Sequence, residues 1–177
     1  MYSSRLDINR LSLIPLLKES GWRPENKIDL EHLYAKLEKQ YQNSQSICDV
    51  LQVPLKEVFP AAKEIIEGFN GVCIKNLHPE LGLGADCNTI EFDFFEYDRS
   101  NFLDLQILNY KAQERLLFIG IGYDIIGDWL IAESGRIYFF NKISDRLHLV
   151  SENIYEFFEQ DIYKLQDING ISIFDHV

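Results

Sequence analysis

The apolar residues of this chain change their spacing near residue 71, and that change limits the folds that it can adopt. Before this point they recur mainly at helical spacing, and beyond it short segments alternate apolar and polar residues, as β-strands do. Asn70-Gly71 stands at the boundary as a strong signal for the end of a helix. The sequence therefore predicts helices first and a sheet, with further helices, after them.

Three helices are predicted before this boundary. The first contains the apolar residues of 11–17, with Ser12 as its cap and Gly21 at its end. The second follows Asp29, which is a good N-cap. The third carries Pro60 at its first position, where the missing amide hydrogen of proline costs nothing.

Strands dominate the remainder of the chain. They are predicted over residues 72–74, 90–94, 116–123, 129–133, 136–141 and 147–150. Two more helices are expected, one over 101–115 and one that begins after Ser151 as its cap. Because Ser134-Gly135 indicates a hairpin and the elements do not alternate strictly, we expect an α+β fold. Its helices would pack against a mainly antiparallel sheet in a single domain over 1–177.

The excess negative charge is confined to the later part of the chain. Residues 1–76 hold ten acidic and ten basic residues, whereas 77–177 hold eighteen acidic and seven basic ones, which gives the net charge of −11. Such an imbalance steers basic partners and disfavours nucleic acid, whose phosphates require a basic surface. The later part is therefore predicted to face something positive, unless its charge only maintains solubility.

One acidic cluster coincides with the strand predicted over 90–94 and the residues after it. Its five carboxylates fall within fourteen residues and are Glu91, Asp93, Glu96, Asp98 and Asp104. Glu91 and Asp93 project from one face of the strand, about 6–7 Å apart. Asp124, Asp128 and Glu133 extend the cluster if the central hairpin lies beside this strand, and Tyr97 adds an aromatic side chain of the kind that concentrates binding energy.

Three interpretations of this cluster are open. It is a surface patch that binds a partner, a carboxylate pair for metal binding or acid–base catalysis, or an ordinary solvated strand face.

No other pattern in the sequence predicts a catalytic or metal site, and we expect neither a cofactor nor a metal. The three cysteines (Cys48, Cys73 and Cys87) lack CxxC spacing and are expected to be reduced thiols. The four histidines are scattered, and two GxG pairs lack the third glycine and the helix that a dinucleotide site needs. With no signal peptide and no apolar run of about 18 residues, the expected location is the cytosol.

Several short blocks, taken in order and spacing, resemble a known superfamily. They are residues 21–24, 27–29, 60–62, 69–71, 116–120, 129–138 and 153–165. Together they resemble the SUKH superfamily, and most closely its third subgroup of bacterial immunity proteins, over about residues 8–165. The chain departs from the pattern in two places, since Phe118-Ile119-Gly120 replaces Pro-Ile-Gly and Phe69-Asn70-Gly71 replaces Phe-Gly-Gly.

The resemblance implies an α+β protein that binds a toxin deployed against competing bacteria and protects the producing cell. Toxins of this kind are often nucleases or nucleic-acid deaminases. Because a nuclease must be basic to hold phosphate, an acidic inhibitor can imitate its substrate and associate quickly. We therefore expect an immunity protein without enzymatic activity, whose acidic surface binds a basic cognate toxin and which binds neither nucleic acid nor membrane.

Two alternatives of other classes stay open. One is a protein-interaction module of the same fold that binds no toxin, because a fold does not determine a function. The other is a small hydrolase that uses the paired carboxylates, which would need a concave pocket with converging titratable groups.

Overall fold

The computed structural model describes residues 6–41, 53–74, 90–94, 102–122, 127–142 and 144–159. The helices in these ranges are α1 (Ile8–Leu11), α2 (Pro15–Glu19), α3 (Leu30–Tyr41), the 3-10 helix η1 (Leu55–Glu57), α5 (Pro60–Phe69), α6 (Phe102–Ala112) and α7 (Ile154–Glu159). The strands are β1 (Val72–Ile74), β2 (Ile90–Phe92), β3 (Leu116–Gly122), β4 (Gly127–Ala132), β5 (Ile137–Asn141) and β6 (Arg146–Ser151).

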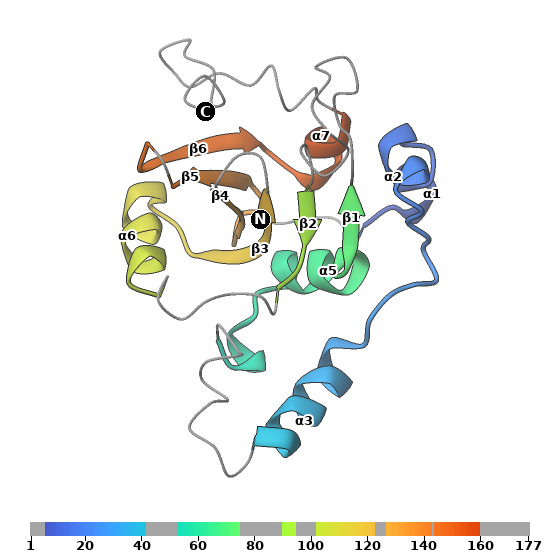
Figure 1. Cartoon of the computed structure of the whole chain (residues 1–177), viewed down its shortest axis with the longest axis horizontal. Helices are drawn as coiled ribbons and strands as arrows, with labels where there is room; N and C mark the ends of the chain where they lie inside the picture. Colours follow the sequence, from blue (N-terminus) through green and yellow to red (C-terminus); the bar gives the residue numbers. More distant parts are fainter. Residues whose placement is uncertain are drawn as a thin grey trace.

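The strands form one six-stranded sheet in the order β1-β2-β3-β4-β5-β6. Each strand pairs antiparallel with its neighbour in the sequence, so the sheet is a continuous meander (Figure 1). The predicted α+β fold with an antiparallel sheet is therefore confirmed. The predicted hairpin is also found, because Gly135 turns the chain between β4 and β5 with a φ of +94°.

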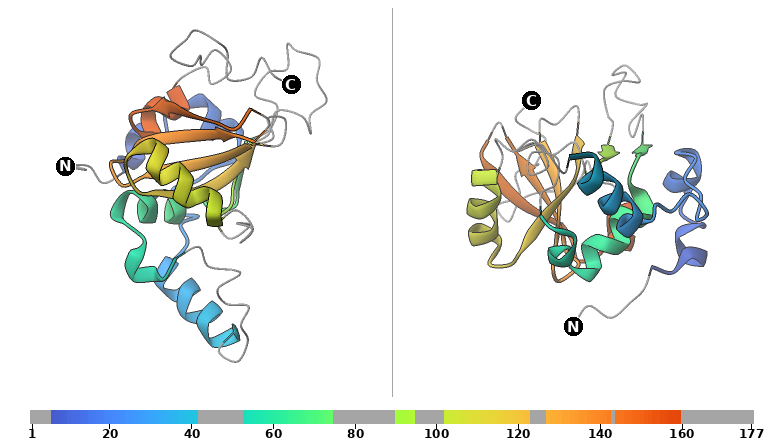
Figure 2. Two further views of the ribbon diagram at one scale, coloured as in Figure 1. Left: turned by 90° about the vertical axis from the view of Figure 1, so that its left-hand side faces the viewer. Right: turned by 90° about the horizontal axis from the view of Figure 1, so that it is seen from below.

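Helices cover the two faces of the sheet unequally. Helix α6 lies on one face, and α5 and α7 lie on the other (Figures 1 and 2). Helices α1 and α2 stand beside β1, at the opposite end of the molecule from α6, while α3 extends away from the sheet. None of the helices in the described ranges has the length and apolarity that a membrane crossing requires.

The larger core fills the space between the sheet and α5 and α7. The fully buried Trp129 ring lies 4.7 Å from the Phe139 ring and 5.1 Å from the Phe157 ring. Phe69 of α5 stacks on Trp22 at 5.7 Å, and Trp22 Nε1 donates a hydrogen bond to the Gly68 carbonyl. These contacts anchor the segment that contains Trp22 to α5. A smaller core lies under α6, where Leu105 and Leu108 pack against residues of β3, β4 and β5.

Most helix boundaries agree with the predictions. Asp29 caps α3 by accepting a hydrogen bond from the His32 amide at 2.9 Å, and Pro60 is the first residue of α5. Gly21 and Gly71 both adopt positive φ, at +76° and +80°, as the stop signals require.

Two predicted caps are wrong. Ser12 ends α1 instead of starting a helix, because the segment forms two short helices and Asp7 provides the N-cap of α1. For α7, the side chain of Asn153 accepts hydrogen bonds from the amides of Tyr155 and Glu156, each at 3.0 Å. Ser151 is the last residue of β6 and is buried. The strand therefore runs further than expected, and the cap falls on the next suitable residue.

The two departures from the superfamily pattern have separate structural explanations. The register between β3 and β4 shifts between Phe118 and Gly120, so this segment contains a β-bulge. Asn70 has a φ of −56° and needs no left-handed conformation. Its side-chain oxygen instead accepts a hydrogen bond from the Phe94 amide at 2.9 Å, which ties the end of α5 to the chain beyond β2.

Candidate partner-binding site

The sheet places two of the predicted acidic residues in one row across the strands. Glu91 of β2 lies opposite Ile121 of β3, and Ile121 lies opposite Asp128 of β4. Residues directly opposite one another in an antiparallel sheet point to the same face, so Glu91 and Asp128 share the face that α6 covers. Two strand spacings separate them, which is about 10 Å.

The alternation predicted around Glu91 is present. Ile90, Phe92 and Phe94 are at most 2% exposed and belong to the larger core. Glu91 and Asp93 are half-buried between them. Glu91 lies on β2, beyond the residues of β3, β4 and β5 that form the small core with α6. Both carboxylates are therefore partly accessible at the β1–β2 side of the sheet.

Asp128 belongs to this row but is not a surface residue. Its 5% exposure places it inside the protein, and Lys142 Nζ lies 2.8 Å from its Oδ1. A buried carboxylate requires such a partner, because an uncompensated charge in the interior is costly. The sequence extended the cluster to Asp128 only if the central hairpin lay beside this strand, but β3 separates β2 from the β4–β5 hairpin. The sequence also did not show that the centre of the sheet would bury this side chain and pair it with a lysine.

The other predicted positions are placed only in part. Asp104 belongs to α6, although its side chain lies outside the described residues. Glu96, Tyr97, Asp98 and Asp124 also lie outside the described residues and stay predictions.

The described histidines and cysteine occupy separate places in the fold. His32 is exposed on α3, His148 is buried on β6, and Cys73 is half-buried on β1. Among the residues that the structure describes, no group of three or more histidine, cysteine, aspartate or glutamate residues could hold a metal ion. Cys48, Cys87, His78 and His176 lie outside these ranges.

Two of the tyrosines that the structure describes have raised pKa values, and packing explains both. Burial, followed by a hydrogen bond to Glu114, raises the pKa of Tyr138 to about 12. Burial, followed by the charge of Glu38, raises the pKa of Tyr34, whose hydroxyl donates to the Val53 carbonyl at 3.0 Å. In each case the raised pKa keeps the tyrosine hydroxyl protonated. A tyrosine that acts as a general base must instead be deprotonated.

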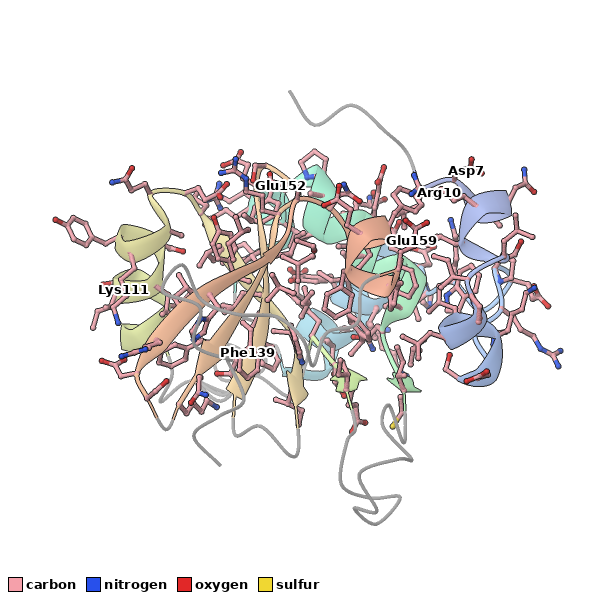
Figure 3. All side chains as sticks on the ribbon, turned by 90° about the horizontal axis from the view of Figure 1, so that it is seen from above. Asp7, Arg10, Lys111, Phe139, Glu152 and Glu159 are labelled. Carbon is pink, nitrogen blue, oxygen red and sulfur yellow. The ribbon has the colours of Figure 1, made fainter. Side chains whose placement is uncertain are left out.

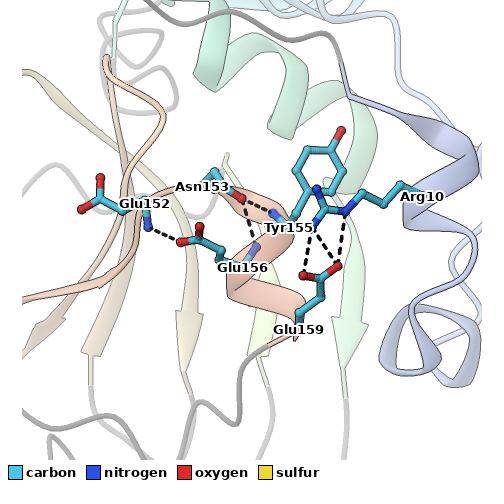
Figure 4. A network of polar contacts seen from close by, with 6 residues as sticks. All are labelled: Arg10, Glu152, Asn153, Tyr155, Glu156 and Glu159. Carbon is cyan, nitrogen blue, oxygen red and sulfur yellow. Dashed lines mark hydrogen bonds and ion pairs between the residues drawn. The ribbon is translucent and has the colours of Figure 1, made fainter.

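A polar network that joins α1 to α7 is not evident from the sequence. Arg10 of α1 donates from Nη2 to both carboxylate oxygens of Glu159 in α7, at 3.0 and 2.9 Å, although 149 positions separate the two residues (Figures 3 and 4). The Arg10 guanidinium also lies 4.5 Å from the centre of the Tyr155 ring. The Tyr155 hydroxyl in turn accepts a hydrogen bond from the Asp7 amide. Nothing in the local sequence of either helix predicts this pairing.

Beside this network lies a groove of about 580 Å³. Its lining residues come from α1, α2, the turn between them and the last turn of α7: Arg10, Leu13, Ile14, Pro15, Leu16, Glu19, Phe158 and Glu159. Most of the lining is apolar. The sequence indicated apolar residues here only as members of a helix, because a groove between distant segments exists only in the fold.

Comparisons with known proteins identify the family. The SUKH-3 immunity protein family matches the chain over residues 12–160. No curated protein and no solved structure matches it. The match spans the segment from α2 to α7, including the whole sheet and both helix layers described above. The chain belongs to the SUKH-3 immunity protein family.

Proposed function

We propose that this protein neutralises a cognate bacterial toxin by binding it through the acidic surface around β2, without catalysing a reaction. Membership of an immunity protein family is the observation that carries the proposal. The excess of acidic residues after residue 76 supports a basic target, and nucleic-acid-targeting toxins are basic because they hold phosphate.

The β1–β2 side of the sheet suits such a contact. Glu91 and Asp93 are partly accessible there, and the buried neighbours Ile90, Phe92 and Phe94 hold this segment in the larger core. A rigid support lets a charged side chain approach a partner without a large loss of conformational entropy. We include Glu96, Tyr97, Asp98, Asp104 and Asp124 in the proposed surface. Asp128 contributes to the local electrostatic potential only as half of an ion pair.

The direct test is protection of cells. The probe is the toxin domain encoded by the reading frame next to the gene, expressed with and without this protein. We expect the wild-type protein to restore growth, and a variant in which Glu91, Asp93, Glu96 and Asp98 are all changed to Lys to protect at least tenfold less well. The matched control is Glu25→Lys, which reverses an exposed charge in the neutral first part of the chain.

The possible results test the acidic surface and the toxin-neutralising function separately. Full protection by the fourfold variant would reject the acidic surface and leave toxin immunity in place. Failure of the wild-type protein to bind or neutralise the toxin would reject the function itself. Loss of protection by Glu25→Lys as well would reject a specific surface, because the effect would follow net charge alone.

A further inference from the structure

We infer that the groove between the α1–α2 turn and the last turn of α7 is a second contact site for the same toxin. It receives an apolar side chain of the toxin that has a lysine or arginine beside it. This inference rests on the proposed function and adds an apolar anchor to the acidic surface.

The lining of the groove favours an apolar side chain. Ile14 and Phe158 are 5% and 4% exposed and form buried parts of the lining, whereas Leu13 is 71% exposed. Every charged residue of the lining (Arg10, Glu19 and Glu159) is exposed. A small polar ligand would need buried polar groups to orient it, and the lining offers none. An aliphatic or aromatic side chain presented by a protein needs only the apolar surface.

The charges at the rim favour a basic neighbour for that side chain. Arg10 is already paired with Glu159 through two hydrogen bonds from Nη2, so these two charges compensate each other. Within the described ranges, the side chain of Glu19 forms no ion pair or hydrogen bond, so the rim has one uncompensated carboxylate. A lysine or arginine next to the apolar anchor would complement it. The same cationic chemistry is expected of the partner of the acidic surface.

The two sides of the groove are held in place before binding. Arg10 joins α1 to α7 through Glu159 and lies over the Tyr155 ring (Figure 4). The Tyr155 hydroxyl also accepts a hydrogen bond from the Asp7 amide at the start of α1. A site fixed in this way loses little conformational entropy when a partner binds. Helix α2 also packs against β1, which pairs with the strand that carries Glu91. The groove therefore lies near the edge of the sheet next to this strand, while Glu91 itself points to the face that α6 covers.

Leu13→Ser tests the groove, with the neighbouring toxin domain in a catalytically inactive form as the probe. The substitution removes an exposed apolar side chain and is not expected to change folding, which thermal unfolding would check. We expect at least a tenfold loss of affinity by calorimetry, nearly all of it in a faster dissociation rate. Glu19→Gln should weaken binding about threefold at low salt and less at high salt.

The matched control is Tyr110→Ser on α6. Tyr110 is 86% exposed and lies on the helix at the opposite end of the molecule. We expect this variant to bind as the wild-type protein does. Unchanged affinity of Leu13→Ser would overturn the inference, and so would an equal loss from Tyr110→Ser.

Three further outcomes each have a separate meaning. If Leu13→Ser changes the association state of the free protein, the groove is a contact between copies of this chain and the inference is wrong. If the wild-type protein does not bind the toxin, the proposed function fails, and the groove's role fails with it. Weakening by the fourfold charge reversal with no effect of Leu13→Ser rejects the groove alone.

Discussion

At the scale of single residues, Gly120 permits the close approach of β2 and β3. A Cβ atom at this position would lie 2.2 Å from the Glu91 carbonyl oxygen and 3.0 Å from the Phe92 Cα. These are backbone atoms and cannot rotate away. The glycine of the superfamily's Pro-Ile-Gly block therefore has a structural role: it lets the strand that carries Glu91 join the sheet.

Gly120→Ala should therefore destabilise the protein by about 1–3 kcal/mol, the usual cost of forcing atoms into a packed interior. Urea unfolding would measure the loss. The matched control is Gly68→Ala in α5, where the added Cβ would meet only the Leu6 Cδ1 atom at 3.4 Å. There we expect no loss, or a gain of about 0.5–1 kcal/mol, because alanine favours a helix interior. Equal effects of the two variants would contradict the account.

The N-cap of α7 gives a second prediction for single residues. Asn153→Ala should cost about 1 kcal/mol of unfolding free energy, because it removes the acceptor of two amide hydrogen bonds. Ser151→Ala should cost little, because within the described ranges the Ser151 hydroxyl is buried without a hydrogen-bond partner. Thermal or urea unfolding of the two variants distinguishes them. If Ser151→Ala lowered the free energy of unfolding more than Asn153→Ala does, Ser151 would be the N-cap of α7, as the sequence predicted.

At the scale of elements, Tyr138 of β5 binds the segment that follows α6. Its hydroxyl donates to Glu114 Oε1 at 2.8 Å, and Glu114 also lies 3.8 Å from Arg136 Nη1. Burial and this hydrogen bond raise the pKa of Tyr138 to about 12. The folded protein therefore retains the phenol proton at a pH where the unfolded chain, with a tyrosine pKa of about 10, has released it.

This difference predicts how stability depends on pH. The contribution of Tyr138 is complete below about pH 10 and is lost as the pH rises toward 12, because the unfolded state then binds fewer protons. Urea unfolding at pH 8, 10 and 11 should show the free energy falling with pH. Tyr138→Phe should show a shallower fall, although Tyr34 retains its own contribution with the same sign. If the free energy of unfolding fell equally with pH in the wild-type protein and in Tyr138→Phe, Tyr138 would not be the origin of the pH dependence.

The sequence predicted the elements well because their signals are local. Helical spacing before Asn70, alternation around Glu91 and the turn at Gly135 each depend on a few neighbouring residues. The caps at Ser12 and Ser151 were wrong because tertiary contacts determine where each element ends and starts. The burial of Asp128 was also missed, since it depends on β4 being central in the sheet.

At the scale of the whole molecule, the two parts of the chain supply different elements of the fold. The neutral first part supplies α1, α2, α3 and α5, and the acidic later part supplies all strands but β1. The superfamily blocks include the fold's anchors, such as Trp22, Asp29 and Trp129. The family match over residues 12–160 contains nearly all of these blocks. The residues proposed to contact the toxin lie mainly outside them, so the blocks do not locate the site.

The charge distribution predicts the kinetics of binding. Complementary charge mainly raises the association rate, and salt screens it. Reversing both Glu91 and Asp93 to Lys should slow association with the inactive toxin domain about tenfold at low salt, while the dissociation rate changes little. Glu25→Lys should leave both rates close to those of the wild-type protein, because it reverses an exposed charge in the neutral part of the chain.

The most direct test of the central claim is the association rate constant of the wild-type protein with its toxin domain, measured by stopped flow from about 20 mM to 500 mM salt. Binding of a basic toxin by an acidic surface predicts a steep, continuous fall in this rate over that range, and a shallower fall for the Glu91→Lys/Asp93→Lys variant. An association rate that is independent of salt, and the same for both proteins, would contradict it.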